Sequence, residues 1–210
     1  MSSCIMQKAE VVVLFDLLCD AAIPISIKDL PKVSEFEHAR ITKAFVDGRL
    51  IDNAIDNIRF DKGFEPFLLP ILKSEKVMLF NYGLNGKCLF NATLYFSKCG
   101  AAAIFDTDAD EVRFITIDSF DDLLLFIPKI PVYKHFTEND VIHFSYIIFD
   151  ENSTTVHCAK INSKKNIAAF AEEKKSVSAE PVKTEFETDM AEYEKLFRGR
   201  LRGVYDVVGC

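Results

Sequence analysis

The spacing of hydrophobic residues changes near residue 76 of this 210-residue chain. Before that point, apolar positions form helix-like segments that prolines and polar residues separate. After it, short runs rich in β-branched and aromatic residues alternate with polar turns. The pattern predicts a helical part in residues 1–75, a sheet in residues 76–162 and a charged helical part in residues 163–210. Such an order of helices, hairpins and helices is typical of the α+β class.

Three helices are expected in the N-terminal part, at Ile5–Cys19, after Ser34 and at Phe64–Lys73. Ser34 is followed three residues later by Glu37, which is the spacing of a capping box, in which each side chain pairs with an otherwise free backbone N–H. Gly48 is expected to end this second helix in a left-handed conformation.

Six strands are expected in the central part, where polar turns join them into antiparallel hairpins. Their expected bounds are Val77–Tyr82, Lys87–Ser97, Ala101–Phe105, Glu111–Ile117, Val141–Phe149 and Ser153–Ile161. Asn85-Gly86 is the sharpest of the turn signals. One helix, Ser119–Ile127 with Ser119 as its N-cap, is expected between the fourth and fifth strands. We therefore predict a central antiparallel sheet.

The charged C-terminal part is expected to form a short helix at Asn166–Lys175, a connector at Ser176–Val182 and a last helix that begins at Thr184. Apolar residues of the last helix recur every three or four positions, at Phe186, Met190, Tyr193, Phe197 and Leu201. We expect this stripe to pack on the chain's own sheet rather than on another molecule. The predicted organisation is one domain in residues 1–162 with the segment 163–210 docked on it.

Composition narrows the class of protein. Hydrophobic residues make up 49% of the chain, which is enough for a packed core, and the net charge of -7 disfavours nucleic acid and anionic membranes as main partners. The N-terminus does not have the pattern of a signal peptide, and the most apolar stretch, Val11–Leu18, is too short to span a bilayer. Six scattered cysteines indicate reduced thiols. We expect a cytoplasmic protein that does not insert into membranes.

The sequence contains no convincing motif for catalysis, a metal or a cofactor. No C-x-x-C or H-x-x-x-H pair occurs, and His157 and Cys158 are neighbours in a strand, where adjacent side chains point to opposite faces. A nucleophile pair of Cys158 and His143 is the remaining enzymatic alternative, and strand alternation disfavours it. We therefore expect no enzymatic activity, no catalytic residue, no metal and no cofactor.

Strand alternation instead suggests a binding surface. One sheet face is expected to be the core, with Phe90, Ala92, Leu94, Phe96, Phe114, Ile142, Phe144, Tyr146, Ile148, Val156 and Cys158. The other is expected to be polar, with Asn91, Thr93, Tyr95, Arg113, His143, Ser145, Thr155 and His157. We select Tyr95, Arg113, His143 and His157 as candidate partner-binding residues, because such side chains combine contact area with directional hydrogen bonds. The alternative is an ordinary solvated face.

The N-terminal helices allow a second interpretation. A helix, a short segment with Ser26 as its N-cap, the helix after Ser34 and an extended stretch at residues 50–60 match the order of a winged helix-turn-helix. Its recognition helix, residues 35–47, has three acidic and only two basic side chains, Arg40 and Lys43. DNA binding is therefore disfavoured, and winged helices also serve as protein contacts.

The order of motifs in residues 36–76 adds a resemblance to a known family. A helix is followed by D-G-R-L-I-D at Asp47–Asp52, a polar gap, F-L-L-P-I-L-K from Phe67, and a strand that begins V-M-L-F at Val77. This resembles the N-terminal half of the bacterial EspG-type chaperones of type VII (ESX) secretion, and shorter proteins of Firmicute type VII clusters, over residues 9–90. The resemblance implies a cytosolic, non-enzymatic chaperone or adaptor that keeps a small helical-hairpin substrate soluble until its delivery. The alternatives are a winged-helix regulator or another protein-interaction module.

Overall fold

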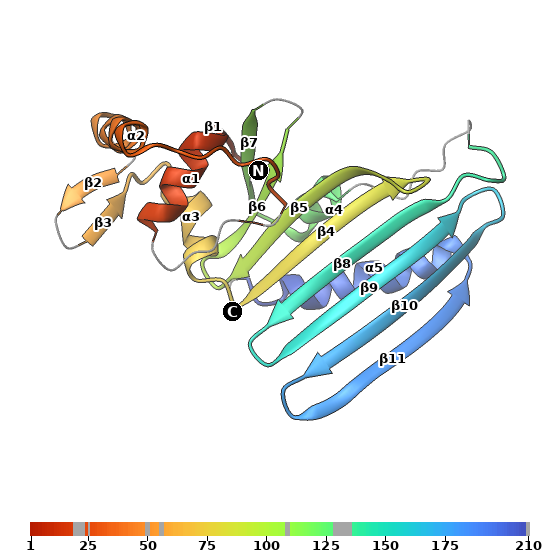
Figure 1. Cartoon of the computed structure of the whole chain (residues 1–210). Helices are drawn as coiled ribbons and strands as arrows, with labels where there is room; N and C mark the ends of the chain where they lie inside the picture. Colours follow the sequence, from red (N-terminus) through yellow and green to blue (C-terminus); the bar gives the residue numbers. More distant parts are fainter. Residues whose placement is uncertain are drawn as a thin grey trace.

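A nine-stranded antiparallel sheet runs through the whole molecule (Figure 1). The computed structural model describes residues 1–18, 24, 26–48, 51–54, 57–107, 110–127 and 136–208. Along the sheet the strands are β1 (Ser3–Gln7), β7 (Glu111–Ile117), β6 (Gly100–Asp106), β5 (Lys87–Ser97), β4 (Lys76–Leu84), β8 (Ile142–Asp150), β9 (Ser153–Asn162), β10 (Ile167–Ser176) and β11 (Ala179–Thr188). A separate hairpin pairs β2 (Ile51–Ala54) with β3 (Asn57–Phe60). The predicted α+β class and central antiparallel sheet are confirmed.

Five helices flank the large sheet among the described residues: α1 (Lys8–Leu17), α2 (Glu35–Asp47), α3 (Glu65–Leu72), α4 (Phe120–Phe126) and α5 (Met190–Tyr205). The first three gather at the end of the sheet where β1, β7 and β6 lie, and α5 runs behind β8–β10 in Figure 1. None of the described helices is long and apolar enough to cross a membrane.

The sheet carries a hydrophobic core on each face. On one face, here called the α5 face, side chains such as Phe80, Leu94 and Phe144 pack with Leu123 of α4 and Phe197 of α5. On the other, here called the α3 face, β5–β7 pack against α1 and α3, and α2 joins the same core through its contacts with α1. Apolar residues therefore point to both sides of the same strands.

The N-terminal segment begins as a strand rather than as a helix. Residues 3–7 pair with β7, and α1 starts only at Lys8, so the predicted helix Ile5–Cys19 was placed too early. Its other end, Cys19, lies outside the described residues. Gln7 and Glu10 form a capping box, in which the backbone N–H of Gln7 donates to Glu10 at 2.8 Å. Strand pairing therefore takes residues that local periodicity assigned to the helix.

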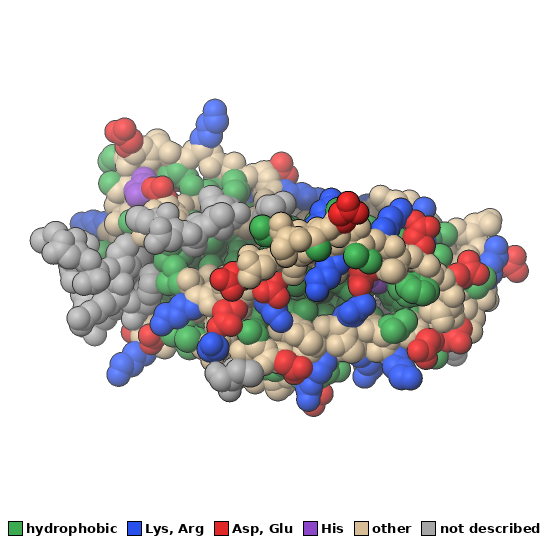
Figure 2. Space-filling view, turned by 90° about the horizontal axis from the view of Figure 1, so that it is seen from below, with side chains coloured by type: hydrophobic (Ala, Val, Ile, Leu, Met, Phe, Trp, Pro, Cys, Tyr) green, Lys and Arg blue, Asp and Glu red, His purple; other side chains and the backbone are tan. Residues whose placement is uncertain are grey.

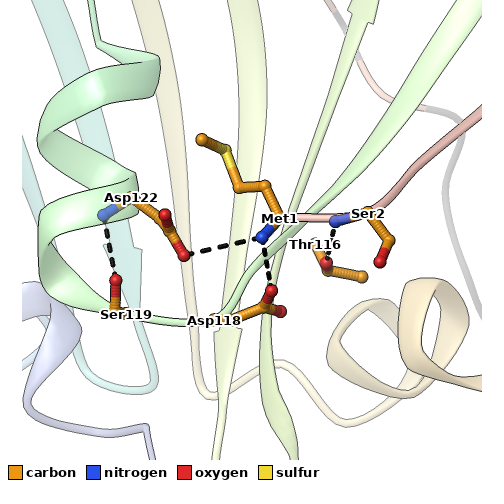
Figure 3. A network of polar contacts seen from close by, with 6 residues as sticks. All are labelled: Met1, Ser2, Thr116, Asp118, Ser119 and Asp122. Atoms are coloured by element: carbon orange, nitrogen blue, oxygen red, sulfur yellow. Dashed lines mark hydrogen bonds and ion pairs between the residues drawn. The ribbon is translucent and has the colours of Figure 1, made fainter.

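Contacts at the very start of the chain hold β1 in place (Figure 3). The amino group of Met1 forms ion pairs with Asp118 and Asp122, which lie at the start of α4. The backbone N–H of Ser2 donates to the hydroxyl of Thr116 at 2.8 Å. The edge strand is thereby tied both to its neighbour β7 and to α4.

The predicted N-caps of α2 and α4 are confirmed. The hydroxyl of Ser34 accepts from the N–H of Glu37 at 3.3 Å, and that of Ser119 accepts from the N–H of Asp122 at 3.1 Å. Two details differ. Gly48 has a φ of −77°, so α2 does not end in a left-handed residue. Ser26 caps no helix, because its buried hydroxyl contacts Thr93 Oγ1 at 2.7 Å and the carbonyl of Ile104.

All six predicted strands are present, and two of them have the expected bounds at both ends. The turn between β4 and β5 has positive φ at both Asn85 and Gly86, 50° and 81°, as a type I′ hairpin turn requires. This local signal therefore identified the hairpin correctly.

The C-terminal part differs most from expectation. The helix predicted at Asn166–Lys175 is wrong, because these residues form β10, and the connector and start of the last helix form a turn and β11. α5 begins only at Met190, where Asp189 accepts from the N–H of Glu192 at 2.9 Å. The sheet thus continues past residue 162 instead of ending there. Pairing of β10 with strands on both sides satisfies its backbone groups and overrides its local helix propensity.

The expected packing of the last helix on the chain's own sheet is confirmed. Tyr193, Phe197 and Leu201 are buried in the core of the α5 face. The ring of Phe197 meets that of Phe144 edge to face, with centroids 4.5 Å apart.

Candidate functional site

The part of the α3 face that lies over β8–β10 is not covered by any described helix (Figure 1). Side chains alternate between the two faces along each strand. Tyr146 and His157 are cross-strand partners on the α5 face, so the side chains on either side of them in β8 and β9 point away from α5. We call this surface the open face. It comprises His143, Ser145, Ile147, Phe149, Thr154, Val156, Cys158, Lys160, Ala169, Ala171 and Glu173.

The open face has an apolar centre and a charged margin. Ile147 and Val156 are cross-strand neighbours and both are half-buried. A shallow hollow of about 600 Å³ extends from His143 across Ala171 to β11. The charged side chains on this side of β9, β10 and β11 balance, because there are three lysines and three glutamates: Lys160, Lys175, Lys183, Glu173, Glu185 and Glu187. The surface therefore favours a partner without a strong net charge.

The four candidate residues do not lie together. His143 is half-buried and lines the hollow of the open face. Tyr95 is on the same side of the sheet but is buried in the core beneath α1–α3. Arg113 lies on the opposite side, across from Phe105, which packs in the core of the α5 face. His157 is also on the α5 face and is only 4% exposed.

The predicted division of the faces is therefore wrong for part of the sheet. Phe114 was expected on the core face with Phe96, yet it lies opposite Ile104 on the α3 face. Val156 and Cys158 are on the open face, and His157 between them is on the α5 face. The physical reason is that both faces carry a core. An apolar residue fixes the alternation within its strand but does not reveal which of two apolar faces it joins.

This correction brings Cys158 and His143 to the same face, where alternation was expected to separate them. Cys158 lies opposite Ser145, and His143 lies opposite Lys160, so the two are diagonal neighbours. Both line the hollow, but no hydrogen bond joins the Cys158 thiol to the His143 ring in the part of the chain that the structure describes. An activated nucleophile needs its base within hydrogen-bond reach, so the arrangement offers no assembled dyad.

A second hollow lies on the α5 face and is lined by His157, which was expected on the opposite, polar face of the sheet. It measures about 390 Å³ and is bounded by β10, β11 and α5. His157 stacks on Tyr146 with centroids 4.6 Å apart and contacts Tyr193, whose hydroxyl lies 2.9 Å from His157 Nε2. Glu172 and Arg200 form an ion pair at 2.7 Å in the same wall. We call this hollow the His157 cavity.

Burial sets the protonation state of the groups around the His157 cavity. Burial, together with the nearby Arg200 guanidinium, lowers the pKa of His157 to about 4. Burial also raises the pKa values of Tyr146 and Tyr193 well above their ordinary range. The imidazole and both phenols are therefore neutral near pH 7.

Among the described residues, no group of three or more His, Cys, Asp or Glu side chains is placed to hold a metal ion. Comparison with known proteins adds no family. No family model matches the chain, and no curated protein matches it. The two hollows of the sheet are therefore the candidate sites of this chain.

Proposed function

We propose that the chain is a cytoplasmic, non-enzymatic chaperone or adaptor that binds a helical segment of a partner protein on its open face. The observation that carries the proposal is the unequal covering of one side of the sheet. Over β5–β7 that side is covered by α3, whereas over β8–β10 it is left without a described helix. A partner helix on the open face would continue the same layer.

The side chains of the open face suit a helix as the occupant. Ala169 and Ala171 on β10 are small, so a helix can approach the sheet closely there. Ile147 and Val156 supply apolar area beside them, and the lysines and glutamates at the margin can pair with either sign of charge. An amphipathic helix placed with its apolar side in this hollow is a common mode of protein recognition.

The resemblance to EspG-type chaperones supports a specific kind of partner, a small helical-hairpin substrate of type VII secretion. The tip of such a hairpin exposes apolar residues that favour aggregation, and a surface with an apolar centre and a polar margin can cover them reversibly. The proposed role is to keep that substrate soluble before delivery.

The winged-helix alternative has one observation in its favour, the β2–β3 hairpin that follows α2. The charges of α2 argue against its use on DNA. Glu35 and Glu37 lie in its first turn, and Arg40, one of its two basic residues, lies 3.9 Å from Glu37. A recognition helix faces phosphates on both walls of the groove, so a net acidic helix is poorly suited to it.

The proposal is tested by affinity purification of the tagged full chain from its native host, followed by mass spectrometry, with two matched variants. Val156→Glu places a charge at the apolar centre of the open face, whereas Val177→Glu places the same charge at the 87% exposed turn between β10 and β11. We expect one small helical protein to co-purify with the parent and with Val177→Glu, and to be lost with Val156→Glu.

Two results would contradict the proposal. One is recovery of no helical partner from the host. The other is a partner that Val156→Glu retains while circular dichroism shows both variants folded. Binding of DNA fragments that is weakened by Arg40→Ala would favour the winged-helix alternative instead.

A further inference from the structure

The His157 cavity is a separate place on the molecule from the open face, because the sheet lies between them. Its walls are mainly aromatic. Phe170 lies 5.5 Å from Phe186 of β11 and 5.4 Å from Tyr193 of α5, measured between ring centroids. Phe186 and Leu196, which are 57% and 44% exposed, also line it and place its mouth at the surface. Figure 2, the view from below, shows hydrophobic side chains between charged ones on the side of the molecule where β11 is the lowest strand in Figure 1.

Two buried polar atoms in this wall have no hydrogen-bond partner. They are Nδ1 of His157 and the hydroxyl of Tyr146, whose side chain is 1% exposed. Only four buried side-chain atoms of this kind occur in the described residues, and these two belong to stacked neighbours. Buried polar groups are nearly always paired, so their coincidence with a cavity indicates a place for a ligand.

The neighbouring contacts determine what kind of group can pair with these atoms. Neutral imidazole carries one N–H, and Nε2 is engaged by the Tyr193 hydroxyl at 2.9 Å. When that hydroxyl donates to Nε2, the ring proton is on Nδ1. Nδ1–H and the Tyr146 hydroxyl are then both donors, and the group that satisfies them is an oxygen acceptor.

Charge in the wall favours a neutral ligand. Glu172 lies 3.7 Å from His157 Nδ1 and would repel a carboxylate placed there. Arg200 is already paired with Glu172 at 2.7 Å, so it does not offer an unshared cation. The aromatic walls add flat apolar contact area.

We propose that the His157 cavity binds a small, neutral, flat aromatic molecule through a carbonyl oxygen. The ring lies among Phe170, Phe186 and Leu196, and the oxygen accepts hydrogen bonds from His157 Nδ1 and the Tyr146 hydroxyl. This binding site goes beyond the proposed partner binding and does not depend on it.

The experiment titrates the ¹⁵N-labelled full chain with acetophenone and follows backbone amide shifts by NMR. Ethylbenzene is the matched probe, because it has nearly the same shape without the oxygen, and benzoate tests the charge. We expect saturable shifts in β10, β11 and α5 with acetophenone, and weaker binding of the other two probes. Tyr146→Phe removes one donor and should weaken acetophenone binding about three- to tenfold, the range for one neutral hydrogen bond, without changing ethylbenzene binding.

Tyr95→Phe is the control variant, because Tyr95 is also a buried tyrosine but lies in the core of the α3 face. Leu196→Trp, at an exposed position of α5, should block the mouth without disturbing the core and should abolish the shifts. The proposal is overturned if benzoate or ethylbenzene binds as tightly as acetophenone. It is equally overturned if a folded Tyr146→Phe binds acetophenone unchanged, if Leu196→Trp still binds it, or if acetophenone gives no saturable shift.

Discussion

Removal of one aromatic ring from α5 should test whether this helix is part of the hydrophobic core or rests loosely on the surface of the sheet. Phe197 is 7% exposed and contacts Phe144 at 4.5 Å and Tyr146 at 5.7 Å between ring centroids. Phe197→Ala therefore removes buried apolar surface and leaves a cavity between α5 and β8. For such substitutions the free energy of unfolding typically falls by about 3–5 kcal/mol. In a chain of this length that corresponds to a decrease in Tm of roughly 6–20 °C.

Leu196→Ala is the matched control, because Leu196 is the adjacent residue of the same helix and is 44% exposed. Its loss should lower the free energy of unfolding by less than about 1 kcal/mol. Both variants can be compared with the parent by urea denaturation followed by far-UV circular dichroism. Equal effects of the two substitutions would refute the reasoning, since α5 would then have no buried side toward the sheet.

Three further predictions concern stability. Burial lowers the pKa of His157 to about 4, so below pH 6.5 the unfolded chain binds a proton that the folded chain does not. The free energy of unfolding should therefore fall as pH decreases from 6.5 toward 4, by at most about 3.5 kcal/mol, and the urea midpoint of His157→Gln should depend less on pH over this range. Gly83→Ala would place its Cβ 2.6 Å from the carbonyl oxygen of Lys87 and should lower the free energy of unfolding by about 1–3 kcal/mol. Gly199→Ala meets no atom within 4 Å and should stabilise α5 by about 0.5–1 kcal/mol. The two variants should shift Tm in opposite directions, and shifts of the same sign would contradict this. Ser34→Ala should cost about 1 kcal/mol and speed amide hydrogen exchange at Glu37, and an unchanged exchange rate would show that the cap does not stabilise α2.

Elements with strong local signals could be predicted from the sequence. The strands Lys87–Ser97 and Glu111–Ile117 have a high content of β-branched and aromatic residues, and the first of them follows the Asn85-Gly86 turn. Ser119 has the side chain that α4 needs at its N-terminus. Ser119 itself accepts the N–H that begins α4, and β5 and β7 each pair with a strand that is next to them in the chain, so their prediction needed little distant information.

β10 and β11 could not be predicted in this way. Their sequences, IAAFAEEKKS and AEPVKTEFET, are rich in Ala, Glu and Lys, which favour helices in isolation. β10 becomes a strand because β9 and β11 pair with it on both sides. β11 lies at the edge of the sheet, where its charged residues and Pro181 are typical of strands that avoid further pairing.

The misassigned β10 also explains why the candidate site was only partly found. His143 lies on the open face and is half-buried, whereas His157 could not be placed without β10. In the sheet Glu172 lies opposite His157, and Phe170 and Glu172 both point toward α5. A helix at these positions would place neither Phe170 nor Glu172 beside the imidazole of His157. The His157 cavity therefore depends on the register in which β10 pairs with β9.

The alternation of β10 further implies that the two proposed sites can be perturbed independently. Ala169 and Ala171 belong to the open face, whereas the side chains of Phe170 and Glu172 line the His157 cavity. Substitutions at the odd positions should therefore affect the protein partner, and those at the even positions the aromatic ligand. A register shift of one residue would exchange the two sets, so loss of both activities from a single odd-position change would indicate a shifted strand rather than a shared site.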